Sequence, residues 1–303
     1  MKLLVWNINQ RSRGDKIPPL VSERIMDFNT DADIVVLTEF LSAVNTNSKE
    51  IMDFKNKLSK KYYTFCNEKR DRERENANGI FIGVKKGFAE INGRPKEDLE
   101  TYYKEEDQPN FLQLEIVVGG KPICIIGTRI QVGGGITSSA YIERRQQLVS
   151  LVEHIVELGN KNIIVAGDFN NAYIHGDETE SYLAVRDEYC KGDINEPLVT
   201  FDTYNYHIMK GIFATAGMNA YTPEGKQYSC GFKLDTDGKP DCGCFKEDHI
   251  VSKNLTIRKE SIKYHHEFIK NYNIDKEWVL HDGRYCITPP FPDHAILIAD
   301  VDL

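Results

Sequence analysis

The most informative segment of the chain is Asn162-Ile163-Ile164-Val165-Ala166-Gly167-Asp168-Phe169-Asn170. Residues 162–167 form a short and largely β-branched apolar run, which is typical of a strand buried in a sheet. Asp168 and Asn170 follow the run directly, so the predicted strand delivers a carboxylate and an amide at its end. A polar side chain in that position is usually a turn former, but it also has the rigid support that a functional site needs.

Similar apolar runs recur along the chain and predict further strands, at 2–8, 33–38, 79–84, 111–118, 122–128, 248–252 and 295–301. Between Ser139 and Gly159 the apolar residues instead show the 3/4 spacing of an amphipathic helix. Residues 172–213 show no clean period and are expected to form a surface loop. Strands that outnumber a few long helices favour an α/β sandwich of two packed sheets with helices outside them over a doubly wound sheet.

Composition narrows the class of protein. The chain has 303 residues, is 41% hydrophobic and carries Lys+Arg 38 against Asp+Glu 46, a net charge of -8. This balance is typical of a globular protein, and no repeat or linker divides the chain, so we expect one domain over 1–303 and a monomer. No run approaches the ~18 apolar residues of a membrane span. Seven scattered cysteines without an export signal favour reduced thiols and a cytoplasmic protein.

Polar residues also stand at the ends of the other predicted strands. They are Asn7, Asn9, Glu39, Asp248, Asp293 and His294. A single such residue carries little weight, because Asp and Asn are common in turns. Five strand ends that each carry Asp, Glu, Asn or His predict instead that these side chains converge on one spot at one edge of the sheets.

The motifs at these ends resemble those of the endonuclease/exonuclease/phosphatase superfamily, and they occur in that family's order. They are W-N-I-N at 6–9, L-T-E-F at 37–40, G-D-F-N at 167–170, D-H-I-V-S at 248–252 and P-D-H at 292–294. The resemblance implies a DNase I-like, four-layered αββα sandwich with two mixed, mainly antiparallel sheets flanked by helices. It also implies Mg²⁺-dependent hydrolysis of phosphoester bonds.

The resemblance further implies a role for each residue. Glu39 would be the principal ligand of Mg²⁺, with Asn9 and Asp293 near the same ion, and Mn²⁺ is the expected substitute for Mg²⁺. Asp168 would orient or deprotonate the attacking water. Asn7 and Asn170 would bind phosphate oxygens or fix their neighbours. His294 would contact the phosphate as an acid, a base or an electrostatic stabiliser, while Asp248 holds its other ring nitrogen and sets its tautomer.

One position departs from the family pattern. Thr128-Arg129-Ile130 stands where many hydrolytic members have Thr-His-Leu. Arg129 cannot act as an acid or base, because its guanidinium stays protonated, but it can bind a phosphate oxygen. The family's R-x-x-Q pattern is present at Arg144 and Gln147, where it is expected to brace the site from behind.

These observations favour a phosphodiesterase or nuclease and leave two alternatives open. A phosphomonoesterase acting on a small phosphorylated substrate agrees with the acidic net charge, which argues against a strong, unspecific grip on nucleic acid. A catalytically silent member that binds RNA or a partner protein is suggested by Arg129 and by an amide, not a carboxylate, at Asn9. For the two enzyme alternatives the expected partner is a phosphoester substrate, which includes nucleic acid. No membrane span is expected in any of the three.

Overall fold

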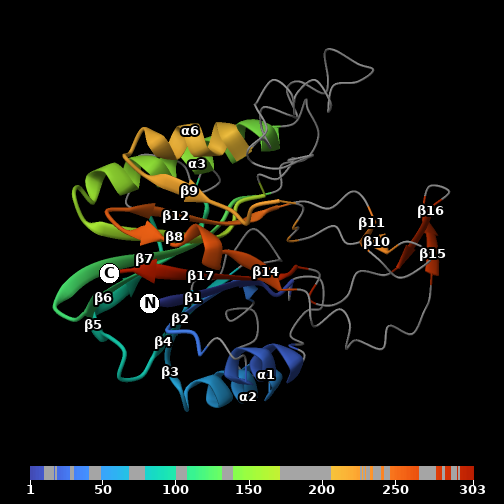
Figure 1. Ribbon diagram of the computed structural model, residues 1–303, viewed down its shortest axis with the longest axis horizontal. Coiled ribbons are helices and arrows are strands. Elements are labelled where there is room, and N and C mark those ends of the chain that lie inside the picture. Colours follow the sequence, from blue (N-terminus) through green and yellow to red (C-terminus); the bar gives the residue numbers. More distant parts are fainter. Residues whose placement is uncertain are drawn as a thin grey trace.

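Two β-sheets lie face to face, with helices on both outer sides, in the computed structural model of the chain (Figure 1). The structure describes residues 1–9, 17, 19–27, 31–40, 49–67, 79–99, 108–131, 139–170, 206–225, 227, 229, 233–234, 240–241, 246–265, 278–281, 284–287, 292 and 294–303. Every predicted strand is present. The loop predicted over residues 172–213 is helical from Tyr206 onward.

The first sheet has seven strands. They are β1 (Lys2–Asn7), β2 (Ile34–Phe40), β3 (Tyr62–Cys66), β4 (Gly79–Lys85), β13 (Thr256–Ile257), β14 (Lys263–His265) and β17 (Ile296–Asp302). Their order is β13-β17-β1-β2-β4-β3, and β14 also pairs with β17. Only the pair β1 and β2 is parallel. Both strands therefore end at the same edge of this sheet.

The second sheet has six strands in the order β5-β6-β7-β8-β12-β9. They are β5 (Glu90–Lys96), β6 (Asn110–Val118), β7 (Lys121–Arg129), β8 (Asn162–Asp168), β9 (Asn219–Tyr221) and β12 (Asp248–Lys253). Here only β7 and β8 are parallel. Two small hairpins lie outside the main sheets: β10 (Lys233–Leu234) with β11 (Pro240–Asp241), and β15 (Trp278–His281) with β16 (Arg284–Ile287).

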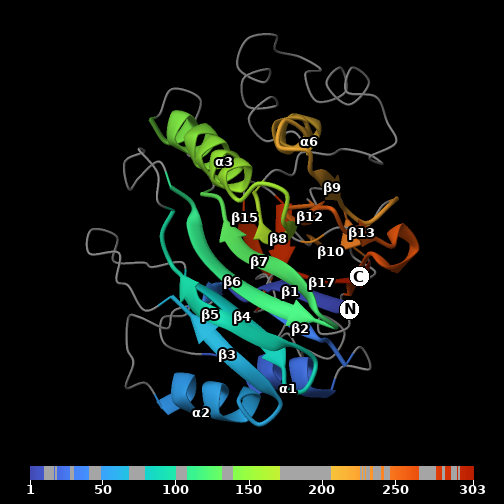
Figure 2. The same cartoon turned by 90° about the vertical axis from the view of Figure 1, so that its left-hand side faces the viewer.

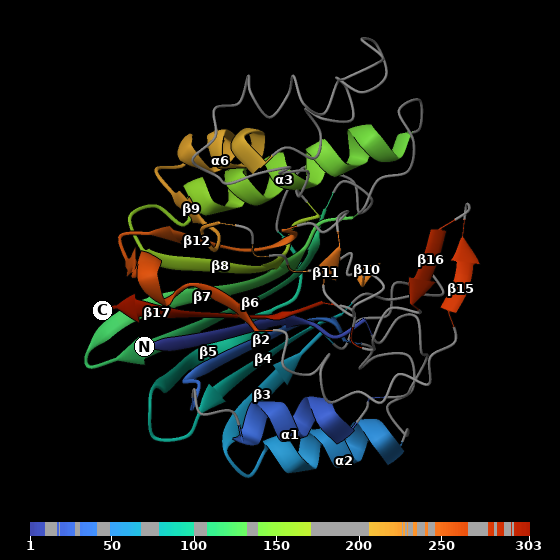
Figure 3. The ribbon, with the colours of Figure 1, turned by 45° about the vertical axis from the view of Figure 1, so that its right-hand side comes forward.

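Side chains that alternate along each strand build three apolar layers. On β1, Leu3 and Val5 face the other sheet, whereas Leu4 and Trp6 belong to the cluster under the helices. Helices α1 (Pro19–Asp27) and α2 (Lys49–Leu58) cover the first sheet, and α3 (Ser139–Glu157) and α6 (Tyr206–Ala214) cover the second (Figures 2 and 3). The predicted αββα sandwich with two mixed, mainly antiparallel sheets is thus confirmed.

Helix α6 corrects the prediction of a loop over 172–213. It begins at Tyr206, and Tyr206, Met209 and Phe213 are buried on one face against the second sheet. The helix has nine residues and is apolar on most of its surface, so its 3/4 spacing did not stand out at the end of a long segment without a period. None of the helices in the described ranges is long and apolar enough to cross a membrane. The single domain, the monomer and the cytoplasmic location stay predictions.

Gly167 on β8 is required by a close approach between two strands. Its φ is 152°, and a Cβ atom at this position would lie 1.9 Å from the carbonyl oxygen of Thr128 on β7. Gly211 on α6 offers a matched control, because a Cβ atom there meets nothing within 4 Å. We expect Gly167→Ala to lower the free energy of unfolding by about 2 kcal/mol or more. Gly211→Ala should be neutral or stabilising by up to about 1 kcal/mol.

Urea unfolding followed by circular dichroism measures both effects. Equal stabilities for the two variants would contradict the assigned contact between β8 and β7.

Candidate active site

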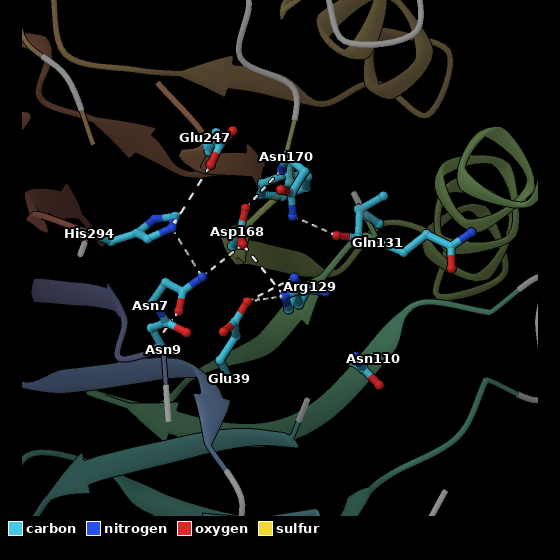
Figure 4. A network of polar contacts seen from close by, with 12 residues as sticks. Asn7, Asn9, Glu39, Asn110, Arg129, Gln131, Asp168, Asn170, Glu247 and His294 are labelled. Atoms are coloured by element: carbon cyan, nitrogen blue, oxygen red, sulfur yellow. Dashed lines mark hydrogen bonds and ion pairs between the residues drawn. The ribbon is translucent and has the colours of Figure 1, made fainter. Parts of the chain in front are cut away.

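The ends of β1, β2, β7 and β8 meet at one edge of the sandwich (Figure 4). Parallel pairing puts Asn7 beside Thr38 in the first sheet and Arg129 beside Asp168 in the second. The antiparallel strands bring their starts to the same edge: Asp248 pairs with Asp168, and His294 stands two residues before β17. Chain direction alone therefore explains why residues far apart in sequence are neighbours here.

Asn7 and Asp168 begin two turns of the same kind. The backbone N–H of Asn9 donates to Asn7 Oδ1 at 2.9 Å, and that of Asn170 donates to Asp168 Oδ1 at 2.9 Å. Asn9 and Asn170 both adopt left-handed backbone with φ of 45° and 48°. Asn tolerates this conformation better than most residues do.

The two turns are joined directly, because Asn7 Nδ2 donates to Asp168 Oδ2 at 2.9 Å. This bond connects the first sheet to the second. Asn170 Nδ2 donates to the carbonyl oxygen of Ile130 at 2.8 Å. Both amides thus fix their neighbours.

Glu39 is aimed by an irregularity in β2. The register between β2 and β4 shifts between Leu37 and Phe40, and Glu39 has a φ of 56°. Gly79 lies opposite the shift, where a Cβ atom would come within 2.3 Å of the carbonyl oxygen of Phe40. A bulge of this kind re-aims a side chain at the end of a strand, and left-handed backbone in a residue other than Gly or Asn is a costly conformation.

Arg129 is the cation at the centre of the site. Its guanidinium is buried. Nε donates to Glu39 Oε1 at 2.9 Å, and Nη2 forms an ion pair with the same oxygen at 2.8 Å. Nε also lies 3.6 Å from Asp168 Oδ2. Both short contacts use Oε1, and within the described part of the chain no hydrogen bond or ion pair engages Glu39 Oε2. One oxygen of Glu39 therefore stays available to another partner.

Asp168 holds its proton more tightly than an ordinary carboxyl group. Burial and the nearby carboxylate of Asp248 raise its pKa from 3.8 to about 7, against the opposing effect of Arg129 and His294. A carboxylate with a pKa near neutrality can exchange a proton at physiological pH.

His294 is held on two sides. Its Nδ1 lies 2.8 Å from Asp248 Oδ2, and the indole Nε1 of Trp6 donates to its backbone carbonyl at 2.8 Å. Asp248 Oδ1 is buried and has no hydrogen-bond partner among the described residues, so the contact with His294 compensates the burial of this carboxylate. Nε2 points to the centre, 3.4 Å from Asn7 Nδ2.

The structure adds a residue that the sequence analysis missed. Glu247 Oε2 lies 3.9 Å from His294 Nε2 (Figure 4), whereas Asp248 contacts the other ring nitrogen, Nδ1. The available signal was an acidic residue directly before Asp248. The expected brace is present: Arg144 donates to the carbonyl oxygens of Gln131, Phe169 and Asn170. Gln147 Oε1 accepts the N–H of Gln131 at 2.9 Å.

Asp293 lies outside the described residues. Within the described ranges no three His, Cys, Asp or Glu side chains form a group that could hold a metal ion. Mg²⁺ needs fewer protein ligands, because it keeps several waters and binds through one or two carboxylates. Glu39 Oε2, which Arg129 does not engage, fits a hydrated ion of this kind.

Comparison with solved structures supports the assignment of the fold. The chain is similar to an AP endonuclease from Archaeoglobus fulgidus, with 16% identity over 100% of both chains and a TM-score of 0.56. It is also similar to a 3' phosphatase from Neisseria bound to a product DNA hairpin, with 17% identity over 100% of both chains and a TM-score of 0.57. A Bacteroides thetaiotaomicron mannosyl-6-phosphatase matches with 15% identity over 100% of both chains and a TM-score of 0.55.

No curated protein sequence matches the chain. The profile of one family does match, over residues 4–261, which include every described site residue except His294. That match spans most of the chain and agrees with the fold and with the motifs at the strand ends. The chain therefore belongs to the Endonuclease/Exonuclease/phosphatase family.

Proposed function

We propose that this protein is a divalent-metal-dependent phosphodiesterase, with nucleic acid among its candidate substrates. The observation that carries the proposal is the contact of Asn7 and Arg129 with Asp168, beside the His294–Asp248 pair. A cation, a carboxylate with a raised pKa and a histidine held by a carboxylate are the groups that phosphoester hydrolysis requires.

Glu39, Asn9 and Asp293 are the proposed ligands of Mg²⁺, with Mn²⁺ as a substitute. Glu39 supports this role because its Oε2 is not taken by Arg129. When bound, the ion supplies positive charge to the phosphoryl oxygens.

Arg129 and His294 are the proposed contacts of the substrate phosphate. The two contacts with Glu39 involve Nε and Nη2, and a guanidinium has five N–H donors in all, so we assign the contact with a phosphate oxygen to donors that these two contacts do not use. Glu39 would then hold Arg129 in place through Oε1 in addition to its role toward the metal. Asn7 and Asn170 keep Asp168 in position, and the amides fix the walls of the site.

Asp168 is the proposed group that orients the attacking water and takes its proton. Both of its oxygens accept hydrogen bonds, from Asn7 and from the backbone of Asn170, so its orientation is set before substrate enters. His294 exchanges a proton at Nε2 with the phosphate or the leaving oxygen, while Asp248 holds Nδ1 and stabilises the charged ring.

A substrate panel distinguishes this function from its alternatives. The purified protein is incubated with Mg²⁺ and single-stranded, double-stranded and abasic DNA, RNA, bis-p-nitrophenyl phosphate and a set of phosphomonoesters. Cleavage of diesters supports the proposal. Release of phosphate from monoesters alone selects the phosphomonoesterase. Tight, metal-independent RNA binding without cleavage selects the silent member.

Glu39→Gln tests the metal site. The variant keeps an oxygen for Arg129 but loses the carboxylate charge, so we expect the dissociation constant for Mn²⁺, measured by calorimetry, to rise at least tenfold. Turnover should fall by about 100-fold or more, as it should when a chelator removes the metal from the wild type. Glu224→Gln removes one exposed charge outside the site and serves as the control. Unchanged Mn²⁺ binding in Glu39→Gln would contradict the assignment.

Asp168→Asn tests the raised pKa of Asp168 through stability. The native-state pKa of about 7 exceeds the ordinary value of 3.8, so the native state binds the extra proton between these values. The stabilisation from this group is therefore present at low pH and is lost as the pH rises through about 7. With a chelator present, the free energy of unfolding of the variant relative to the wild type should increase by about 1–3 kcal/mol from pH 5 to pH 8.

Urea unfolding at the two pH values measures this difference, and Asp53→Asn on the exposed side of α2 is the control. A difference between Asp168→Asn and the wild type that does not change with pH would show that Asp168 is ionised in the native state at pH 5.

A further inference from the structure

Glu247 is built firmly into the wall of the site. Its backbone N–H donates to Ser229 Oγ at 2.7 Å, and its carbonyl oxygen accepts the N–H of Phe169 at 2.8 Å. The second bond ties Glu247 to the residue directly after Asp168. Its side chain is 20% exposed and extends toward His294 Nε2, at 3.9 Å (Figure 4). The carboxylate is thus held near the ring nitrogen that faces the centre of the site.

Glu247 shares its histidine with a second carboxylate, Asp248. Glu39 is neutralised by Arg129, and Asp248 by His294 when the ring is protonated. Glu247 is a further negative charge on the same histidine. Burial and the Asp248 carboxylate are the larger causes of the raised pKa of Asp168, and Glu247 contributes to it as well. The negative charge of Glu247 therefore acts at the centre of the site.

We propose that Glu247 determines specificity by making the site prefer phosphodiester monoanions to phosphomonoester dianions. This inference rests on the proposed function, because it requires the substrate phosphate to lie against His294. A diester brings one negative charge to that position, whereas a monoester above its second pKa of about 6 brings close to two. The additional charge meets the Glu247 carboxylate, and repulsion of this kind discriminates between ligands without any new attractive contact.

Glu247→Gln tests the proposal, because it removes the charge and keeps the shape. We compare kcat/KM for bis-p-nitrophenyl phosphate and p-nitrophenyl phosphate at pH 8 with Mg²⁺. An additional unit charge a few ångströms away in a partly hydrated site corresponds to about a tenfold effect. The ratio of diester to monoester kcat/KM should fall about tenfold, chiefly through faster monoester hydrolysis at lower KM. The control Glu224→Gln should leave this ratio unchanged.

Two outcomes would overturn the inference. An unchanged ratio in Glu247→Gln would show that its charge does not select the substrate. A parallel loss of about 100-fold in kcat for both esters would make Glu247 a group that serves the chemistry of either substrate.

A binding measurement separates this inference from the proposed function. Calorimetry with inorganic phosphate and with dimethyl phosphate, on the Mg²⁺-loaded protein at pH 8, requires no turnover. Glu247→Gln should bind both anions more tightly, and the gain should be about tenfold larger for inorganic phosphate, which carries the additional charge, than for dimethyl phosphate. If the wild type hydrolyses neither ester, the proposed function fails, and the two affinities still decide the role of Glu247. Equal changes for both anions would contradict it.

Discussion

The buried ion pair between Arg129 and Glu39 is the contact on which the site depends. Glu39 ends a strand of the first sheet and Arg129 ends a strand of the second, so the pair ties the two sheets together at one edge. Charges removed from water are costly unless they are paired with good geometry, and here one guanidinium serves Glu39 closely and Asp168 at 3.6 Å. The bond from Asn7 to Asp168 joins the same sheets beside it. The site is therefore part of the seam of the sandwich.

Two turns of the same kind hold the amide of Asn7 and the carboxylate of Asp168 where the two sheets meet. In Asn7-Ile8-Asn9 and in Asp168-Phe169-Asn170, the first side chain accepts a backbone N–H two residues ahead and the last residue is left-handed. The middle side chain is buried in the apolar layer under the helices of its own sheet. Each turn is thus anchored by burial and oriented by a hydrogen bond. This explains physically why W-N-I-N and G-D-F-N carry information beyond their individual residues.

Sequence alone predicted eight of the strands, the inner strands of the two sheets, because long apolar runs are local signals. It did not predict β3, β5, β9, β13 or β14, which are shorter or more exposed. Polar strand ends predicted most of the converging residues. The Arg129–Glu39 pair could not be predicted, since its members are 90 positions apart and on different sheets. The bulge that orients Glu39 has only one sign in the sequence, the glycine at position 79 on the opposite strand. Glu247 precedes its strand, and nothing local indicates that its side chain turns toward His294. Helix α6 was missed because nine residues offer few periods to detect. Long-range pairing and backbone irregularity account for these failures.

The described part of the candidate site has more carboxylates than cationic side chains, and this excess of negative charge affects how an anionic substrate would enter. Four described carboxylates, those of Glu39, Asp168, Glu247 and Asp248, face two side chains that can be cationic, Arg129 and His294. An anionic phosphate entering this surrounding meets repulsion unless a carboxylate is protonated or more positive charge arrives. The raised pKa of Asp168 reduces this repulsion, because a protonated Asp168 removes one negative charge from the site. Glu39, if it holds a divalent ion as proposed, would add positive charge to the same surrounding. Asp168 would then lose its proton more readily and would be available as the proposed base for hydrolysis.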